Sequence, residues 1–153
     1  MNINSKRVSL FISYSIGLPL GLAFSLLCFV LPTYLSGEGL ATMALVAIYG
    51  KAIIGLIIAF VFGLGIGSLV AHKSFLNEFS LLKTSFQYSL IVNCIIWISF
   101  IVITIISNFE NFSLLYIIPP AIAFVLSTLL TTFTIGLLIC YLIRRSILKT
   151  NYN

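Results

Sequence analysis

Hydrophobic residues dominate this chain in four long stretches, which short polar segments separate. The hydrocarbon core of a bilayer is about 30 Å thick, and a helix of about 20 residues crosses it. Each stretch reaches that length, and the polar breaks leave almost no mass outside a membrane. The pattern therefore predicts an all-α, polytopic integral membrane protein with one transmembrane domain. Its four transmembrane helices are expected at about residues 8–31, 51–71, 84–106 and 119–143.

Two segments next to the second predicted helix allow more than one interpretation. Residues 40–71 form an apolar run that is too long for one upright span. Residues 40–50 are therefore either an outer extension of a tilted helix or an interfacial piece that breaks away near Gly50. Residues 72–83 form the only substantial loop. We expect a short interfacial amphipathic helix there, because Phe75 and Phe79 share a helical face; the alternative is an extension of the third helix.

Prolines mark two further irregularities in the predicted helices. Pro19 lies inside the first span, where it removes a backbone hydrogen bond and is expected to kink the helix. Pro119 and Pro120 are tolerated only in a first helical turn, so the fourth span is expected to begin near Pro119.

The basic residues predict the orientation of the chain in its membrane. Of the eight Lys and Arg residues, all but Lys51 fall before the first helix, in the loop 72–83 or after the fourth helix. Short cytoplasmic loops carry an excess of such residues. Both termini and the loop 72–83 are therefore predicted to be cytoplasmic. The seven residues on this side are Lys6, Arg7, Lys73, Lys83, Arg144, Arg145 and Lys149.

Composition supports the membrane assignment and narrows the expected partners. The chain is 61% hydrophobic and 7% charged, whereas soluble domains carry roughly 25% charged residues. We attribute the net charge of +5 to basic residues that orient the chain in its membrane. No basic stripe with interleaved aromatic residues indicates nucleic-acid binding. The lipid bilayer is thus the expected partner. Frequent Ile, Asn, Phe and Lys residues suggest an AT-rich bacterial source, and hence a bacterial plasma (inner) membrane.

Rows of small residues recur at fourfold spacing on three of the predicted helices. Residues four apart lie one above another on a helix, and small ones let helix backbones approach closely in lipid. The rows are Ser9, Ser13, Gly17, Gly21 and Ser25 on the first helix, Gly55, Ala59, Gly63, Gly67 and Ala71 on the second, and Thr128, Thr132, Gly136 and Cys140 on the fourth.

These rows predict helix-packing ridges, with two arrangements open. The first and second rows could pack against each other in an antiparallel hairpin, or one row could face a second subunit. One hairpin uses only two of the three rows. The third row therefore favours a homo-oligomer or a partner membrane protein.

Polar residues within the spans form the candidate functional site. Lys51 is interpreted as a lysine that reaches the outer headgroups; the alternatives are an anion-binding cavity at the outer surface and a buried ion pair with Glu38 or Glu110. For the other polar residues within the spans, one explanation is hydrogen bonding between helices, and the second is a polar path for a substrate. The candidate path comprises Lys51, Asn93, Thr128, Thr131 and Thr132.

Residues suited to catalysis or metal binding are sparse. The sequence contains no Asp, its three Glu residues lie outside the predicted spans, and its single His, His72, is expected at the cytoplasmic rim. Cys28, Cys94 and Cys140 lie inside apolar stretches without a C-x-x-C spacing. No catalytic, cofactor-binding or metal-binding residues are therefore predicted, and the chain is not expected to be an enzyme. Proton-coupled transport is disfavoured too, because no predicted span contains a carboxylate.

The function predicted from the sequence is that of a small, non-catalytic, multi-pass membrane protein. It would act as a subunit, an anchor, or an assembly or immunity-type factor in a membrane complex. The alternative is a small oligomeric channel or facilitator without proton coupling.

Overall fold

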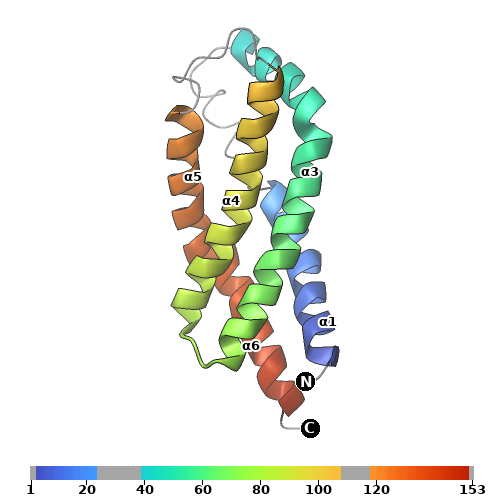
Figure 1. The fold of residues 1–153 in the computed structure, drawn as a ribbon, viewed down its shortest axis with the longest axis vertical. Helices are drawn as coiled ribbons and strands as arrows, with labels where there is room; N and C mark the ends of the chain where they lie inside the picture. Colours follow the sequence, from blue (N-terminus) through green and yellow to red (C-terminus); the bar gives the residue numbers. More distant parts are fainter. Residues whose placement is uncertain (1–2, 24–38, 108–117, 152–153) are drawn as a thin grey trace.

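The computed structural model describes residues 3–23, 39–107 and 118–151, and all of these except residues 77–80 are helical. The predicted all-α class is confirmed for this part of the chain. Helical residues 18–23 continue the first helix beyond its π-helical turn. The elements in order are α1 (Ile3–Ile12), η1 (Ser13–Gly17), α3 (Gly39–Leu76), α4 (Leu81–Ser107), α5 (Ile118–Thr131), η4 (Thr132–Gly136) and α6 (Leu137–Asn151) (Figure 1).

The helices form an elongated bundle in which consecutive long helices run in opposite directions (Figure 1). Helix α1 contacts α3 and α6, while α4 contacts α3 along one side and α5, η4 and α6 along the other. Both chain ends and the α3–α4 turn lie at the same end of the bundle. We call this the basic end, because it carries Lys6, Arg7, Lys73, Lys83, Arg144, Arg145 and Lys149.

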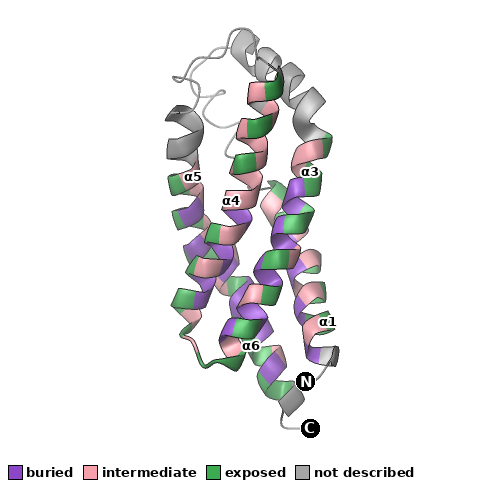
Figure 2. Cartoon of the chain, in the orientation of Figure 1, coloured by how far each residue is buried: buried purple, intermediate pink, exposed green. Residues whose placement is uncertain are grey.

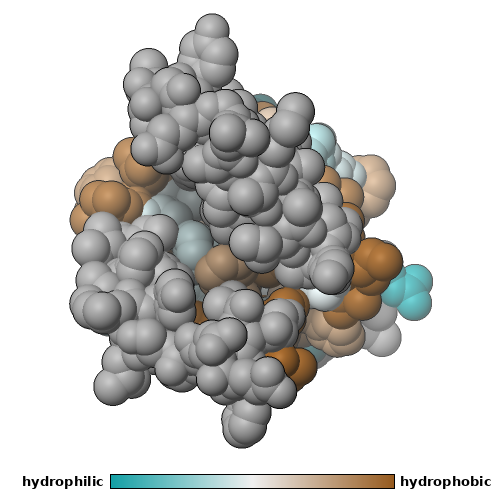
Figure 3. Space-filling model, turned by 90° about the horizontal axis from the view of Figure 1, so that it is seen from above, coloured by the Kyte–Doolittle hydropathy of each residue, from teal (hydrophilic) through white to brown (hydrophobic). Residues whose placement is uncertain are grey.

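Three helices in the described part of the chain are long and apolar enough to cross a membrane: Ile54–Leu76, Leu81–Ile103 and Phe124–Lys149. The first predicted span, 8–31, is described only as far as residue 23. Large apolar side chains such as Phe11, Phe62 and Ile98 are exposed on the outside of the bundle. Figure 2 shows the exposed positions on the outer helix faces, and brown apolar side chains lie around the bundle seen from above in Figure 3. This outer surface suits a lipid environment.

Helix α3 is continuous from Gly39 to Leu76 and does not break near Gly50. At about 1.5 Å per residue its 38 residues are much longer than the hydrocarbon core of a bilayer. Of the two interpretations of residues 40–50, the structure shows the helical extension.

The prediction of a separate amphipathic helix at residues 72–83 is wrong. Residues up to Leu76 belong to α3 and those from Leu81 to α4, which leaves a tight turn between them. Glu78 adopts a left-handed conformation with a φ of 61°, and the amide of Phe79 donates to the carbonyl of Ser74 at 3.2 Å. The side chain of Ser80 then accepts from the amide of Lys83 at the start of α4, at 3.4 Å.

The interior of the bundle is as polar as it is apolar. Among the described residues, twelve polar or charged residues and ten apolar residues are buried. The twelve are His72, Asn93 and ten Ser or Thr residues. The apolar core includes Leu64, Tyr88, Ile139 and Ile143. Since the largest aliphatic side chains also cover the outside, the hydrophobic effect alone does not explain this interior, and close contact and hydrogen bonds must contribute.

Glycines mark the closest helix contacts. Gly63 lies against Val92, and Gly67 lies against Tyr88 and Val92, so the glycine row of α3 packs on α4. The expected hairpin of the first two spans is present on one side only, because Gly17 and Gly21 of the first row lie against Leu64 and Phe60 of α3 while the α3 row faces α4. A methyl group added at Gly63 would lie 3.4 Å from the Val92 backbone, an ordinary contact. At Gly136 the same group would come within 2.5 Å of the Ser89 hydroxyl and 2.8 Å of the Thr131 carbonyl.

We predict opposite outcomes for two matched glycine substitutions. Gly136→Ala should lower the free energy of unfolding by about 1–3 kcal/mol, because the added methyl group overpacks the contact with α4. Gly63→Ala should be neutral or stabilising by up to about 1 kcal/mol, because alanine favours the helix. Unfolding of both variants in mixed micelles, followed by Trp97 fluorescence, measures the difference. Equal effects of the two substitutions would contradict the described packing.

Candidate functional site

All three rows of small residues face the interior of the one chain. Ser9, Ser13 and Gly17 of the first row are buried, and Gly21 is half-buried; Ser25 lies outside the described residues. The remaining buried members are Ala59, Gly63, Gly67 and Ala71 on α3, where Gly55 is half-buried, and Thr128, Thr132, Gly136 and Cys140 on the last helix. Contacts within one chain therefore account for each described row.

Two π-helical turns, which the sequence reasoning missed, lie where the first helix packs on α3 and where the last helix packs on α4. The turn Ser13–Gly17 begins with a buried serine and ends with a buried glycine. The turn Thr132–Gly136 begins with a buried threonine and ends in the same way. The two turns share a pattern of hydroxyl residue, aromatic residue, hydroxyl residue, Ile and Gly. This repeated pattern is the signal in the sequence that could have revealed them.

Pro19 lies just after the first of these turns. Its ring nitrogen carries no proton, so the regular helix cannot continue unchanged through this position. The amide of Leu18 donates to the carbonyl of Tyr14, and the wider π turn ends before the proline. The kink expected at Pro19 thus has a π-helical turn beside it. The second turn has no proline after it, so proline is not the shared cause.

Hydrogen bonds join the first helix to α3 and α4 deep in the bundle. The Ser13 hydroxyl and the Tyr88 phenol are 2.7 Å apart, and the Ser13 hydroxyl also donates to the carbonyl of Leu64 at 3.3 Å. The phenol of Tyr14, the next residue of η1, donates to the carbonyl of Val61 on α3 at 3.0 Å. Ser13 therefore connects three helices through one hydroxyl group.

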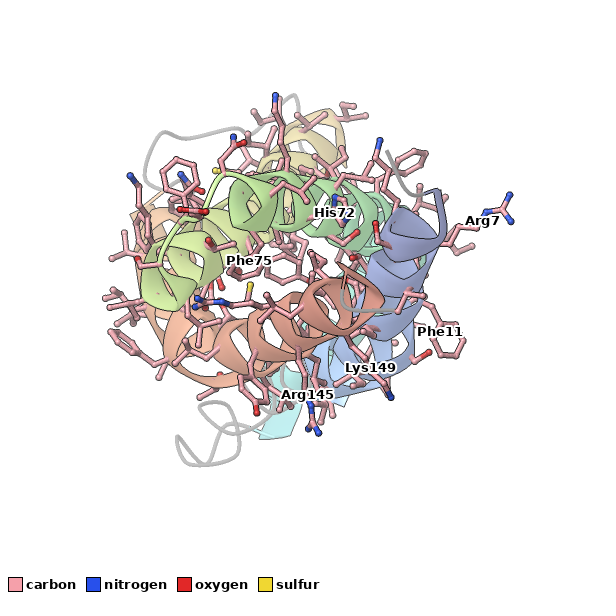
Figure 4. The ribbon with its side chains drawn as sticks, turned by 90° about the horizontal axis from the view of Figure 1, so that it is seen from below. Arg7, Phe11, His72, Phe75, Arg145 and Lys149 are labelled. Atoms are coloured by element: carbon pink, nitrogen blue, oxygen red, sulfur yellow. The ribbon has the colours of Figure 1, made fainter. Side chains whose placement is uncertain are left out.

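His72 differs from the exposed rim residue that the sequence suggested. Its side chain is only 2% exposed, and its Nε2 lies 3.0 Å from the hydroxyl of Ser5 on α1. Figure 4 shows His72 on α3 beside α1, whereas Arg7 points away from the bundle. A histidine next to a serine also occurs in hydrolytic sites, where an acidic residue orients the imidazole. Among the described residues no group of three His, Cys, Asp or Glu side chains comes together.

A second group of hydrogen bonds joins α4 to the last helix. The amide nitrogen of Asn93 donates to Thr131 Oγ1 at 3.0 Å and to the carbonyl of Ser89 at 2.8 Å. The indole of Trp97 donates to the Ser127 hydroxyl at 3.0 Å. Closer to the basic end, the Ser85 hydroxyl donates to the carbonyl of Thr132 at 2.7 Å.

The candidate polar path is thus only partly brought together. Asn93 and Thr131 are in contact, whereas the hydroxyls of Thr128 and Thr132 donate to carbonyls of their own helix at 2.7 and 2.6 Å. The side chain of Lys51 lies outside the described residues. In these bonds the amide of Asn93 and the hydroxyls of Thr128 and Thr132 already donate to other groups of the protein. Hydrogen bonding between and within helices therefore explains directly why these polar side chains lie inside the bundle.

Two buried hydroxyls have no partner in the described structure, Thr84 Oγ1 and Ser89 Oγ. Both lie on α4, and the Ser89 hydroxyl is close to Gly136 on the last helix. Cys94 and Cys140 carry free thiols, of which Cys140 is fully buried; Cys28 lies outside the described residues. The arrangement can hold helices in register, and it provides no nucleophile with an activating base and acid.

No protein-family model, curated protein sequence or solved structure matches this chain. Its function must therefore be argued from the arrangement of its own residues.

We predict that Ser13 and Tyr88 are energetically coupled. A double-mutant cycle with Ser13→Ala and Tyr88→Phe should give a coupling energy of about 0.6 kcal/mol, and at most about 1.7 kcal/mol, the range for hydrogen bonds between membrane helices. The measurement is unfolding in mixed micelles. Ser13→Ala combined with Trp97→Phe is the control, and those effects should add, because Trp97 bonds Ser127 elsewhere. Additive effects in the Ser13 and Tyr88 cycle would contradict the bond.

Proposed function

We propose that this chain is a non-catalytic subunit of a membrane complex, acting as an anchor or as an assembly or immunity-type factor. The observation that carries the proposal is the internal pairing of its conspicuous groups. The rows of small residues pack within one chain, and the polar side chains of α4 bond to neighbouring helices or to carbonyls. The interior then serves to build a stable bundle, and interaction with other molecules falls to the outer surface.

The proposed topology has four membrane-spanning helices with both termini and the α3–α4 turn in the cytoplasm of a bacterial cell. Three helices have the necessary length and apolar character, and the first helix would supply the fourth span. Both ends of the described chain and the α3–α4 turn lie at one end of the bundle (Figure 1). Lys6, Arg7 and the other basic residues of the basic end belong to these segments, which supports this orientation through the positive-inside rule.

Reporter fusions test the orientation. A fluorescent protein joined after Asn153 should fluoresce, because that reporter folds in the cytoplasm, and alkaline phosphatase joined after Glu110 should be active, because that enzyme folds outside it. Changing Arg144 and Arg145 to Gln should weaken the preference, since basic residues set the orientation. An active phosphatase at the C-terminus would contradict the proposed topology.

Purification in mild detergent tests the subunit role. We expect a second membrane protein to co-purify with the tagged chain from its native host, and proteoliposomes of the chain alone to show no ion or solute flux above empty vesicles. The mass of the purified particle distinguishes assembly with itself from assembly with another protein. Flux that Asn93→Leu abolishes would contradict the subunit role and favour the channel alternative, because Asn93 belongs to the candidate polar path.

A further inference from the structure

The α3–α4 hairpin carries a groove of about 400 Å³ near its turn at the basic end. Both helices contribute to its walls, and the groove is open on one side. Its size is within the range of about 300–1,000 Å³ that is usual for sites that bind small molecules. The groove lies apart from the hydrogen bonds between α4 and the last helix, so those contacts do not account for it.

Polar groups line the part of the groove that is closer to the turn. Lys73 and Asn77 are exposed and lie four residues apart on α3, so they share a face of that helix. Across the groove, Gln87 Oε1 accepts a hydrogen bond from the Ser74 hydroxyl at 3.2 Å. This bond orients the amide and leaves its nitrogen to donate. Among the described residues, neither that nitrogen nor the Lys73 ammonium has a partner.

Apolar side chains line the part of the groove that lies deeper along the bundle. Val70 precedes Lys73 by three residues on α3, and Leu90 and Ile91 follow Gln87 by three and four residues on α4. At about 1.5 Å per residue, these side chains lie about one helical turn further from the basic end than the polar ones. The groove is therefore polar toward the basic end and apolar toward the middle of the bundle.

The charge at the groove is positive. Lys73 is the only charged residue among the residues that line it. The Lys83 ammonium lies 4.5 Å from the centre of the Phe79 ring, and that ring also forms part of the groove wall. Glu78, the one acidic residue in the turn, is exposed and does not line the groove.

We propose that this groove binds an anionic phospholipid of the surrounding bilayer. The lipid phosphate would accept hydrogen bonds from Lys73, Asn77 and the amide of Gln87, and an acyl chain would lie on Val70, Leu90 and Ile91. A soluble anion would use only the polar part, whereas a lipid matches both parts and their order relative to the membrane. The inference does not depend on the proposed subunit role.

Native mass spectrometry of the full chain in detergent tests the site, with titrations of phosphatidylglycerol and phosphatidylcholine. The chain should retain phosphatidylglycerol in preference to phosphatidylcholine. Lys73→Met should weaken phosphatidylglycerol binding about five-fold, the effect expected of one lysine near an anionic membrane surface. Lys149→Met is the matched control and should leave binding unchanged. Lys149 is also exposed at the basic end but points away from the bundle (Figure 4).

A second variant tests the apolar part of the groove without changing its charge. Leu90 is 36% exposed, so Leu90→Trp should fold while its ring fills the space proposed for the acyl chain. It should weaken phosphatidylglycerol binding, and inorganic phosphate should not compete with the lipid. Equal losses in Lys73→Met and Lys149→Met, equal binding of the two lipids, or full competition by inorganic phosphate would each overturn the proposal. If Leu90→Trp does not fold, the comparison of Lys73→Met with Lys149→Met still decides whether the groove binds phosphatidylglycerol.

Discussion

Close contact between α4 and its neighbours is the constraint on which the rest of this structure depends. In lipid, no hydrophobic driving force pulls apolar helices together, so contact distance and hydrogen bonding determine whether they pack. Gly63 and Gly67 bring the α3 backbone against Val92 and Tyr88, and Gly136 brings the last helix against Ser89. With larger residues at Gly67 and Gly136, where an added methyl group would lie within 3.0 Å of the facing atoms, the helices would separate and lose the hydrogen bonds that need the same distances. The glycines and the serines thus act together.

The polar face of α4 forms hydrogen bonds with the other helices that these close contacts bring together. Tyr88 reaches Ser13 on the first helix, Ser85 reaches the carbonyl of Thr132, and Asn93 reaches Thr131. These contacts involve both π-helical turns, where the wider backbone spacing changes which residues face α4. A π turn shifts the facing residues relative to a regular helix. The irregular backbone of the first and last helices therefore fits the positions of the hydroxyls on α4.

Much of the architecture follows from hydropathy alone, because spans of about 20 apolar residues and a one-sided distribution of basic residues are properties of the sequence. The small rows also indicated the contact faces. Their partners could not be predicted, since a row at fourfold spacing identifies a face and not the helix opposite it; the α3 row meets α4. The turn at Glu78 was missed because a left-handed residue other than glycine leaves a weak sequence signal. The burial of His72 depends on Ser5, which is distant in the sequence.

The described polar groups of the interior and those of the surface differ in their hydrogen-bond partners. The hydroxyls of Ser13 and Ser85 and the amide of Asn93 form hydrogen bonds between helices. Thr128 and Thr132 donate hydrogen bonds to carbonyls of their own helix. Near the basic end, the Lys73 ammonium and the amide nitrogen of Gln87 line the groove between α3 and α4 without a partner among the described residues. The proposed subunit role therefore assigns interaction with other molecules to the surface, which has two chemically different parts, the apolar flank and the basic end. A membrane partner would meet the flank, and anionic headgroups would meet the basic end.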